Sequence, residues 1–184
     1  MSAIVAAPGA AAEQPSLLLL QTAACSVKAL LRPRGDGAVS SNLRNNFAHL
    51  MMANPPAALP SVETFVCSVA RAVGVSAIVV VTSLIYVERL TARLPQAATG
   101  KADSPYRIFL AALLLADKYW SDKALKVASL VAATGGLFRH REILAMERAL
   151  LRILGFDLYV SADHIRRFAG NLGIDIDATS PQPV

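Results

Sequence analysis

The chain has 184 residues, of which 54% are hydrophobic and 17% are charged, and its mean hydropathy is +0.46. This length allows one domain of ordinary size with an extension, and the composition is far too apolar for a disordered protein. The formal net charge is +5, spread along the chain without a block of like charges, so it suits any acidic partner and indicates none in particular.

Membrane insertion and secretion are not expected. The uncharged stretch 72–87 is shorter than the ~20 apolar residues of a membrane-spanning helix, and no basic residue precedes the Leu17–Leu20 run as in a secretory signal. Cys25 and Cys67 offer neither a disulfide framework nor metal-ligand spacing, which is typical of a reducing compartment. We therefore expect the protein in the cytoplasm, the nucleus or both.

Residues 1–59 are predicted to be a mostly flexible N-terminal extension with one or two short helices. Alanine, glycine, proline and serine dominate its beginning. One helical segment over residues 16–31 has Ser16 as its N-cap, and Pro55-Pro56 then breaks any helix.

From Pro60 onward the pattern predicts an all-α domain over residues 60–172, followed by a loose C-terminal tail over 173–184. Capping residues and apolar periodicity place helices over residues 61–74, 76–94, 104–119, 122–135, 139–154 and 161–171. Residues 78–87 are rich in β-branched side chains, as in a strand, but the long stretch without glycine or proline favours a buried helix.

The helix over residues 104–119 is predicted to be the centre of the fold. Its apolar side chains point in every direction around the axis, which is typical of a helix surrounded by others. The helix over 139–154 instead has one broad apolar face opposite an arginine-bearing one. Together these patterns predict a central helix wrapped by about four more.

Two charges break this pattern. Glu147 falls inside the apolar arc of its helix, where a desolvated carboxylate needs a partner. Lys118, next to Asp117, comes after the nine uncharged residues 108–116 of the central helix. Either Lys118 reaches solvent while Glu147 makes an internal ion pair, or both stand at the edge of a surface that binds another protein.

Three segments resemble the cyclin box. These are LIYVERL at Leu84–Leu90, SPYRIFLAALLLADKYWSD at Ser104–Asp122 and GGLFRHREILAMERALLRILGFDLYVS at Gly135–Ser161. In this order and spacing they are similar to the second, third and fifth cyclin helices. The single box and the Gly-Gly before the last segment resemble the P/U-type cyclins, known best from fungal phosphate-responsive kinases.

The resemblance implies a five-helix cyclin box whose function is to bind and activate a cyclin-dependent protein kinase. In that family a lysine ending the third helix and a glutamate in the fifth hold the kinase, which by motif implies Lys118 and Glu147. The candidate apolar contacts around them are Tyr119, Leu137, Phe138 and Leu144, each with an ordinary core position as the alternative.

The acidic residue that ends the second cyclin helix is Glu88 in this chain. The arginine that usually pairs with it from the first helix is absent, and Arg107 is the predicted substitute. We therefore expect a structural ion pair between Glu88 and Arg107.

We expect no enzymatic activity, catalytic residue, metal or cofactor, small-molecule substrate or membrane partner. The three histidines lie in separate segments, and no phosphate-binding glycine loop is present. The alternative function is nucleic-acid binding, because the cyclin fold also serves in transcription factors and the pI is about 9.6. A DNA reader, however, usually gathers its basic residues on one element, so nucleic acid is the less favoured partner.

Overall fold

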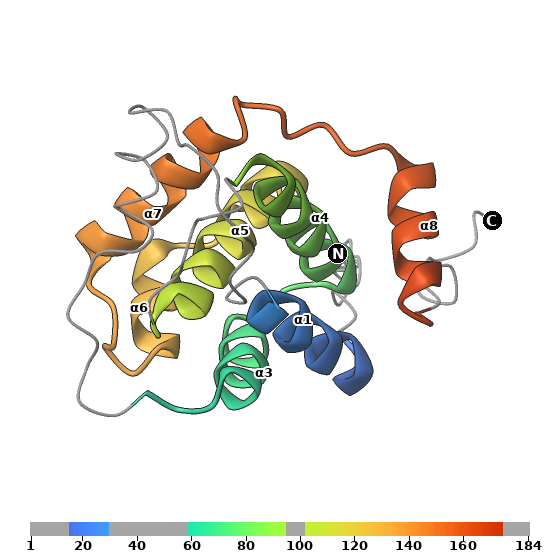
Figure 1. Cartoon of the computed structure of the whole chain (residues 1–184). Coiled ribbons are helices and arrows are strands. Elements are labelled where there is room, and N and C mark those ends of the chain that lie inside the picture. Colours follow the sequence, from blue (N-terminus) through green and yellow to red (C-terminus); the bar gives the residue numbers. More distant parts are fainter. Residues whose placement is uncertain (1–14, 30–58, 95–101, 175–184) are drawn as a thin grey trace, which may run out of the picture.

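Helix follows helix in the computed structural model of this chain, which describes residues 15–29, 59–94 and 102–174. Within these ranges the chain forms seven helices and no strand, which confirms the predicted all-α class (Figure 1). They are α1 (Leu17–Ala29), α3 (Val62–Val73), α4 (Ala77–Arg93), α5 (Ser104–Trp120), α6 (Val127–Ala133), α7 (His140–Ile153) and α8 (Ala162–Asn171). None of them is long and apolar enough to cross a membrane.

Local capping chemistry explains where several helices begin and end. The Ser61 hydroxyl accepts a hydrogen bond from the Thr64 amide at 3.1 Å and starts α3. Gly74 ends that helix in the left-handed region, with φ 67°, which a residue with a Cβ adopts only at some cost. Ser161 caps α8 through the His164 amide at 3.2 Å.

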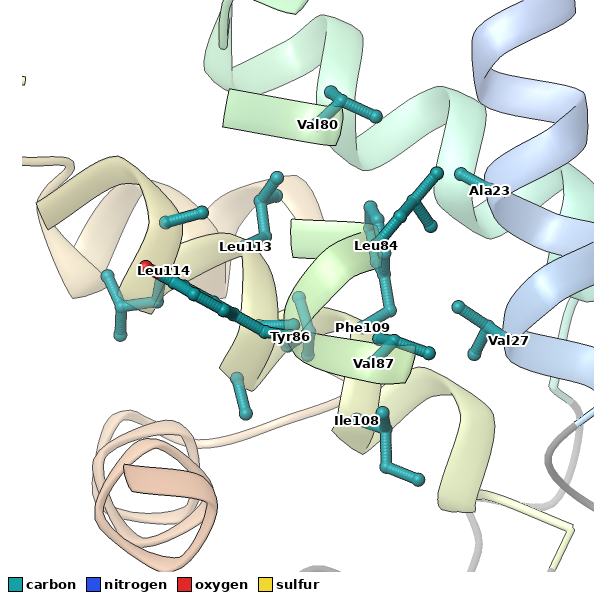
Figure 2. Close-up of a cluster of buried hydrophobic side chains, with 14 of the residues drawn as sticks. Ala23, Val27, Val80, Leu84, Tyr86, Val87, Ile108, Phe109, Leu113 and Leu114 are labelled. Carbon is teal, nitrogen blue, oxygen red and sulfur yellow. The ribbon is translucent and has the colours of Figure 1, made fainter. Parts of the chain in front are cut away.

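The central position of α5 is confirmed. Its residues from Ser104 to Asp117 are all buried, and the helix packs between α4 and α7. In Figure 2, Phe109 and Leu113 of α5 lie beside Leu84 of α4. Burying a leucine completely stabilises the fold by roughly 1.5–3 kcal/mol, so this helix contributes much of the core.

The β-branched segment of residues 78–87 is helical, because it forms most of α4. Residues 79–87 are all buried, as expected for a helix covered on several sides. Figure 2 shows Val87 beside Ile108 of α5 and facing Val27 of α1.

Helix α1 lies within the predicted N-terminal extension and packs against α3, α4 and α5. One of its faces is fully buried, through Leu19, Leu20, Ala23, Ala24 and Val27. At its C-terminal end the Lys28 ammonium donates to the Glu63 carboxylate of α3. The flanking residues 1–14 and 30–58, and the tail from 175, lie outside the described residues, so the division into extension, domain and tail stays a prediction.

The prediction that the helix after α5 begins at Asp122 is wrong, because α6 begins at Val127. The Asp117 carboxylate accepts hydrogen bonds from the Ser121 hydroxyl at 2.8 Å and from the Leu125 amide at 2.5 Å. These bonds satisfy the backbone in a loop around Asp117, which competes with an additional helical turn.

The segment between α7 and α8 crosses the surface of α4 without forming a strand. Three α4 side chains, one turn apart, donate to its carbonyls. Tyr86 donates to Leu158 at 2.9 Å, and Arg89 to Asp157 and Tyr159 at 2.9 and 2.7 Å. Arg93 likewise donates to the Leu154 carbonyl. In Figure 1 this segment leads from α7 to α8, which stands beside α4.

Candidate functional site

The two charges that break the apolar pattern lie together at the junction of α5 and α7. Lys118 is in the last turn of α5, and Glu147 is in the middle of α7. The Lys118 Nζ and Glu147 Oε1 atoms are 2.5 Å apart. The Lys118 side chain is 41% exposed, whereas that of Glu147 is 9% exposed. The ion pair therefore joins a nearly buried carboxylate to an ammonium group at the surface.

The position of Glu147 explains why it needs this partner. It belongs to the buried face of α7, one turn after Ile143 and one turn before Leu150, both of them core residues. An unpaired carboxylate there would lose its hydration without compensation. The internal ion pair, one of the two alternatives raised by the sequence, is thus present.

This ion pair does not use up the hydrogen-bonding capacity of its members. An ammonium group has three donors and a carboxylate about four acceptor positions. In the described part of the chain, Lys118 makes this one side-chain contact. Two of its donors therefore remain for water or for the main chain of another protein.

Half-buried apolar side chains surround the ion pair. Leu144 and Leu151 lie one turn before and one turn after Glu147 on α7, and both are partly exposed. On α5, Tyr119 directly follows Lys118 and is 39% exposed. The Tyr119 ring packs edge-on against Trp120 with 5.3 Å between centroids, and the Trp120 indole donates to the Thr82 hydroxyl at 2.8 Å. These contacts hold the aromatic end of α5 in place.

Phe138, one of the predicted apolar contacts, does not line this surface. It is 1% exposed, its ring packs edge-on against Phe65 at 6.3 Å, and the Arg107 guanidinium lies 5.2 Å from its centroid. Phe138 is therefore a core residue, which was the alternative to a contact with the partner. Leu137, the preceding residue, is partly exposed, and it follows Gly136, whose φ of 78° helps turn the chain after α6.

The predicted ion pair between Glu88 and Arg107 is wrong. Arg107 instead binds Asp103 one turn earlier in the chain, with 2.6 Å between Nε and Oδ2, and Glu142 of α7, with 3.3 Å between Nη2 and Oε1. Glu88 is exposed and needs no protein partner. Asp103 is fully buried, so Arg107 supplies the charge that this carboxylate requires.

Glu142 has a second function in the same region. Its other carboxylate oxygen accepts a hydrogen bond from the Arg139 amide at 2.8 Å, which caps the start of α7. The side chain therefore fixes the beginning of α7 relative to α5. The sequence analysis missed this role, although a glutamate three residues into a helix is a recognised capping signal.

The sequence analysis also missed Leu151 and Phe156 as surface residues. Leu151 continues the line of Leu144 and Glu147 along α7. Phe156 follows α7, is 69% exposed and has a φ of 62°, a strained value for an aromatic residue. The helical spacing of Leu151 could have revealed it, whereas nothing in the sequence indicates the backbone angle of Phe156.

Tyr86 links this surface to the segment after α7. Burial raises the pKa of the Tyr86 phenol well above its usual value, and the neighbouring Tyr119 adds to that rise. The neutral phenol is then the donor to the Leu158 carbonyl across the whole physiological pH range. Tyr119 and the segment around Leu158 therefore lie near the same α4 side chain.

Among the described residues no group of three or more His, Cys, Asp or Glu side chains is placed to hold a metal ion. The features brought together here are instead a charged pair, a half-buried apolar surround and an exposed aromatic residue. This combination is typical of protein–protein contact surfaces.

Comparison with known proteins adds the family. Residues 47–159 match the family described as "Cyclin, N-terminal domain". The chain is similar to PHO85 cyclin-1 of Saccharomyces cerevisiae, with 36% identity over 107 residues, which are 58% of this chain and 38% of that protein. It is also similar to PHO85 cyclin-9 of the same yeast, with 28% identity over 102 residues, which are 55% of this chain and 34% of that protein. The aligned region thus spans little more than a third of either curated relative.

Proposed function

Because this chain belongs to the cyclin family, we propose that it is a regulatory subunit that binds and activates a cyclin-dependent protein kinase. The observation that carries the proposal is the Lys118–Glu147 pair within a half-buried apolar surround, found at the positions implied by the cyclin motif. Both yeast relatives carry PHO85 in their names. A kinase of the PHO85 type is therefore our proposed partner.

The proposed contribution of this chain is conformational. A kinase reaches its active geometry when its regulatory helix is held inward and its Lys–Glu ion pair forms. A subunit that binds this inward state more tightly than the outward one shifts the kinase toward activity. In this proposal the junction of α5 and α7 supplies the binding surface.

Each member of the ion pair has a proposed role toward the kinase. Lys118 donates its two free N–H groups to main-chain carbonyls at the end of the kinase's regulatory helix, because helix C-termini have unsatisfied carbonyls. Glu147 accepts from main-chain N–H groups of the preceding loop. Tyr119, Leu144 and Leu151 exclude water around these bonds, which strengthens them.

The proposal includes no catalytic activity of the chain itself. The direct test combines the purified full chain with purified PHO85 kinase and measures phosphate transfer to a peptide substrate. We expect a complex in size-exclusion chromatography, transfer that rises when the chain is added, and no transfer when the kinase is omitted. A chain that neither forms the complex nor raises the transfer rate would contradict the proposal.

A further inference from the structure

Three arginines form a line on the solvent face of α7. Arg141, Arg148 and Arg152 are all exposed, and their spacing of seven and four residues places them along one side of the helix. We call these three residues the basic ridge. Helix α7 packs against α5 and α6 through its opposite face and lies at the outside of the molecule in Figure 1.

The positive charge of the basic ridge is not neutralised by its own helix. The two acidic residues of α7 are engaged elsewhere, since Glu142 binds Arg107 and Glu147 binds Lys118. In the described part of the chain, none of the three ridge guanidinium groups has an ion-pair or hydrogen-bond partner. Arg148 and Arg152 also lie one turn apart, where like charges repel.

Other arginines of the same domain show the contrast. Arg89 and Arg93 of α4 are both bound by Asp157 and by main-chain carbonyls. These two side chains hold the segment after α7 in place. The ridge arginines have no comparable structural task, so their charge is available to a molecule outside the chain.

The basic ridge borders the proposed kinase surface. Leu144 lies one turn before Arg148, and Leu151 directly precedes Arg152, so the partly exposed leucines and the arginines form parallel lines on α7. A nucleic-acid backbone would pair with the arginines and leave the leucines uncovered. A protein with acidic side chains beside an apolar contact would pair with the arginines and also cover the leucines.

We propose that the basic ridge binds acidic side chains at the edge of the kinase and speeds its association with this chain. The inference rests on the proposed function, because the kinase is the occupant. Charges at the edge of an interface act mainly by steering the encounter, which changes the association rate more than the dissociation rate. Salt screens this steering, with a Debye length of about 8 Å at physiological ionic strength.

The test measures association and dissociation rates of the full chain with purified PHO85 kinase at several salt concentrations. One variant replaces all three ridge arginines by glutamine, and a second replaces them by glutamate. The matched control makes the same change of charge at three exposed basic residues outside α7. Its substitutions are Arg71→Glu in α3, Lys126→Glu at the start of α6 and Arg167→Glu in α8. Circular dichroism checks that each variant is folded, and the neutral glutamine variant serves alone if the glutamate variant is not.

We expect the glutamate variant to associate about ten times more slowly at low salt, with a smaller loss for the glutamine variant. The difference should disappear near about 0.5 M salt, where charges are strongly screened. Dissociation rates and the association rate of the control should stay close to those of the unmodified chain.

Several results would overturn the inference. Ridge variants that associate as fast as the unmodified chain would refute it while leaving the proposed function in place, and so would an equal loss in the control. If the unmodified chain does not bind the kinase at all, both proposals fail. Submicromolar, salt-sensitive binding of a short DNA duplex that the ridge variants lose would assign the basic ridge to nucleic acid instead.

Discussion

Replacing Lys118 and Glu147 separately and together distinguishes a structural ion pair from a partner-binding one. In the free chain, Lys118→Ala leaves the Glu147 carboxylate on the buried face of α7 without its partner. An unmatched buried polar group costs about 1–3 kcal/mol. We expect about 1 kcal/mol, at the lower end of that range, because the Lys118 end of the pair is 41% exposed and water can reach it. The double variant removes both charges and should lose less stability than the sum of the single losses.

Binding to the kinase should respond differently from stability, because here the loss at each residue adds to the loss at the other. Each truncation leaves polar atoms of the kinase main chain unmatched, at about 1–3 kcal/mol per site. The double variant should therefore bind more weakly than either single variant, by at least about tenfold relative to the unmodified chain, since 1.4 kcal/mol corresponds to a factor of ten. Urea unfolding followed by circular dichroism gives the stabilities, and calorimetry with PHO85 kinase gives the affinities.

The control for these variants is a second ion pair far along the chain. Asp163 and Arg166 of α8 are 3.0 Å apart and exposed, so the double change Asp163→Ala with Arg166→Ala should leave kinase binding unchanged. A Lys118/Glu147 double variant that unfolds would show that the pair is only structural. A double variant that stays folded and holds the kinase as tightly as the unmodified chain would refute the assigned roles.

Three further predictions concern the fold. Leu113→Ala, at a fully buried site of α5, should lower the free energy of unfolding by about 2–5 kcal/mol in urea titrations, whereas the exposed Leu18→Ala should change it by less than about 0.5 kcal/mol. Gly74→Ala meets no atom within 4 Å but keeps a φ of 67°, so we expect a loss of about 1–2 kcal/mol from backbone strain alone, and an unchanged melting temperature would contradict this. The hydrogen bond from Lys28 is the largest cause that lowers the pKa of Glu63, so this pair should stabilise the fold above about pH 4.5 and stop doing so as pH falls through the lower folded-state pKa. The Lys28→Met variant should show a smaller pH dependence in thermal melts, and an equal one would contradict this.

Local chemistry made much of the fold predictable. The start of α3 depends on a hydrogen bond between Ser61 and Thr64, and its end depends on Gly74 and the carbonyls three and four residues before it. Each interaction is local, so the sequence contains the relevant information. The same holds for the all-round apolar pattern of α5, which indicates a surrounded helix without any knowledge of its neighbours.

Side-chain contacts that the apolar pattern does not encode explain what could not be predicted. The prediction that α6 begins at Asp122 is wrong because the Asp117 carboxylate accepts hydrogen bonds from the loop, and these bonds compete with helical ones. Arg107 binds Asp103, which is close in the sequence, and Glu142, which is far from it; only the contact with Glu142 depends on which helix end lies beside α5. For Lys118 and Glu147 the pattern identified two unusual charges, but only the packing of α5 on α7 shows that they meet.

The position of α1 has a practical consequence for any attempt to isolate this domain. The family match covers residues 47–159 and therefore leaves out α1, as well as α8. Yet Ala23 and Val27 of α1 face Leu84 and Val87 in the same buried cluster (Figure 2). A fragment cut at the limits of the family match would present that apolar face to water, where it would favour self-association over a monomeric fold. The unit that folds is thus larger than the unit by which relatives are recognised, and fragment boundaries should be drawn from the packing of the helices.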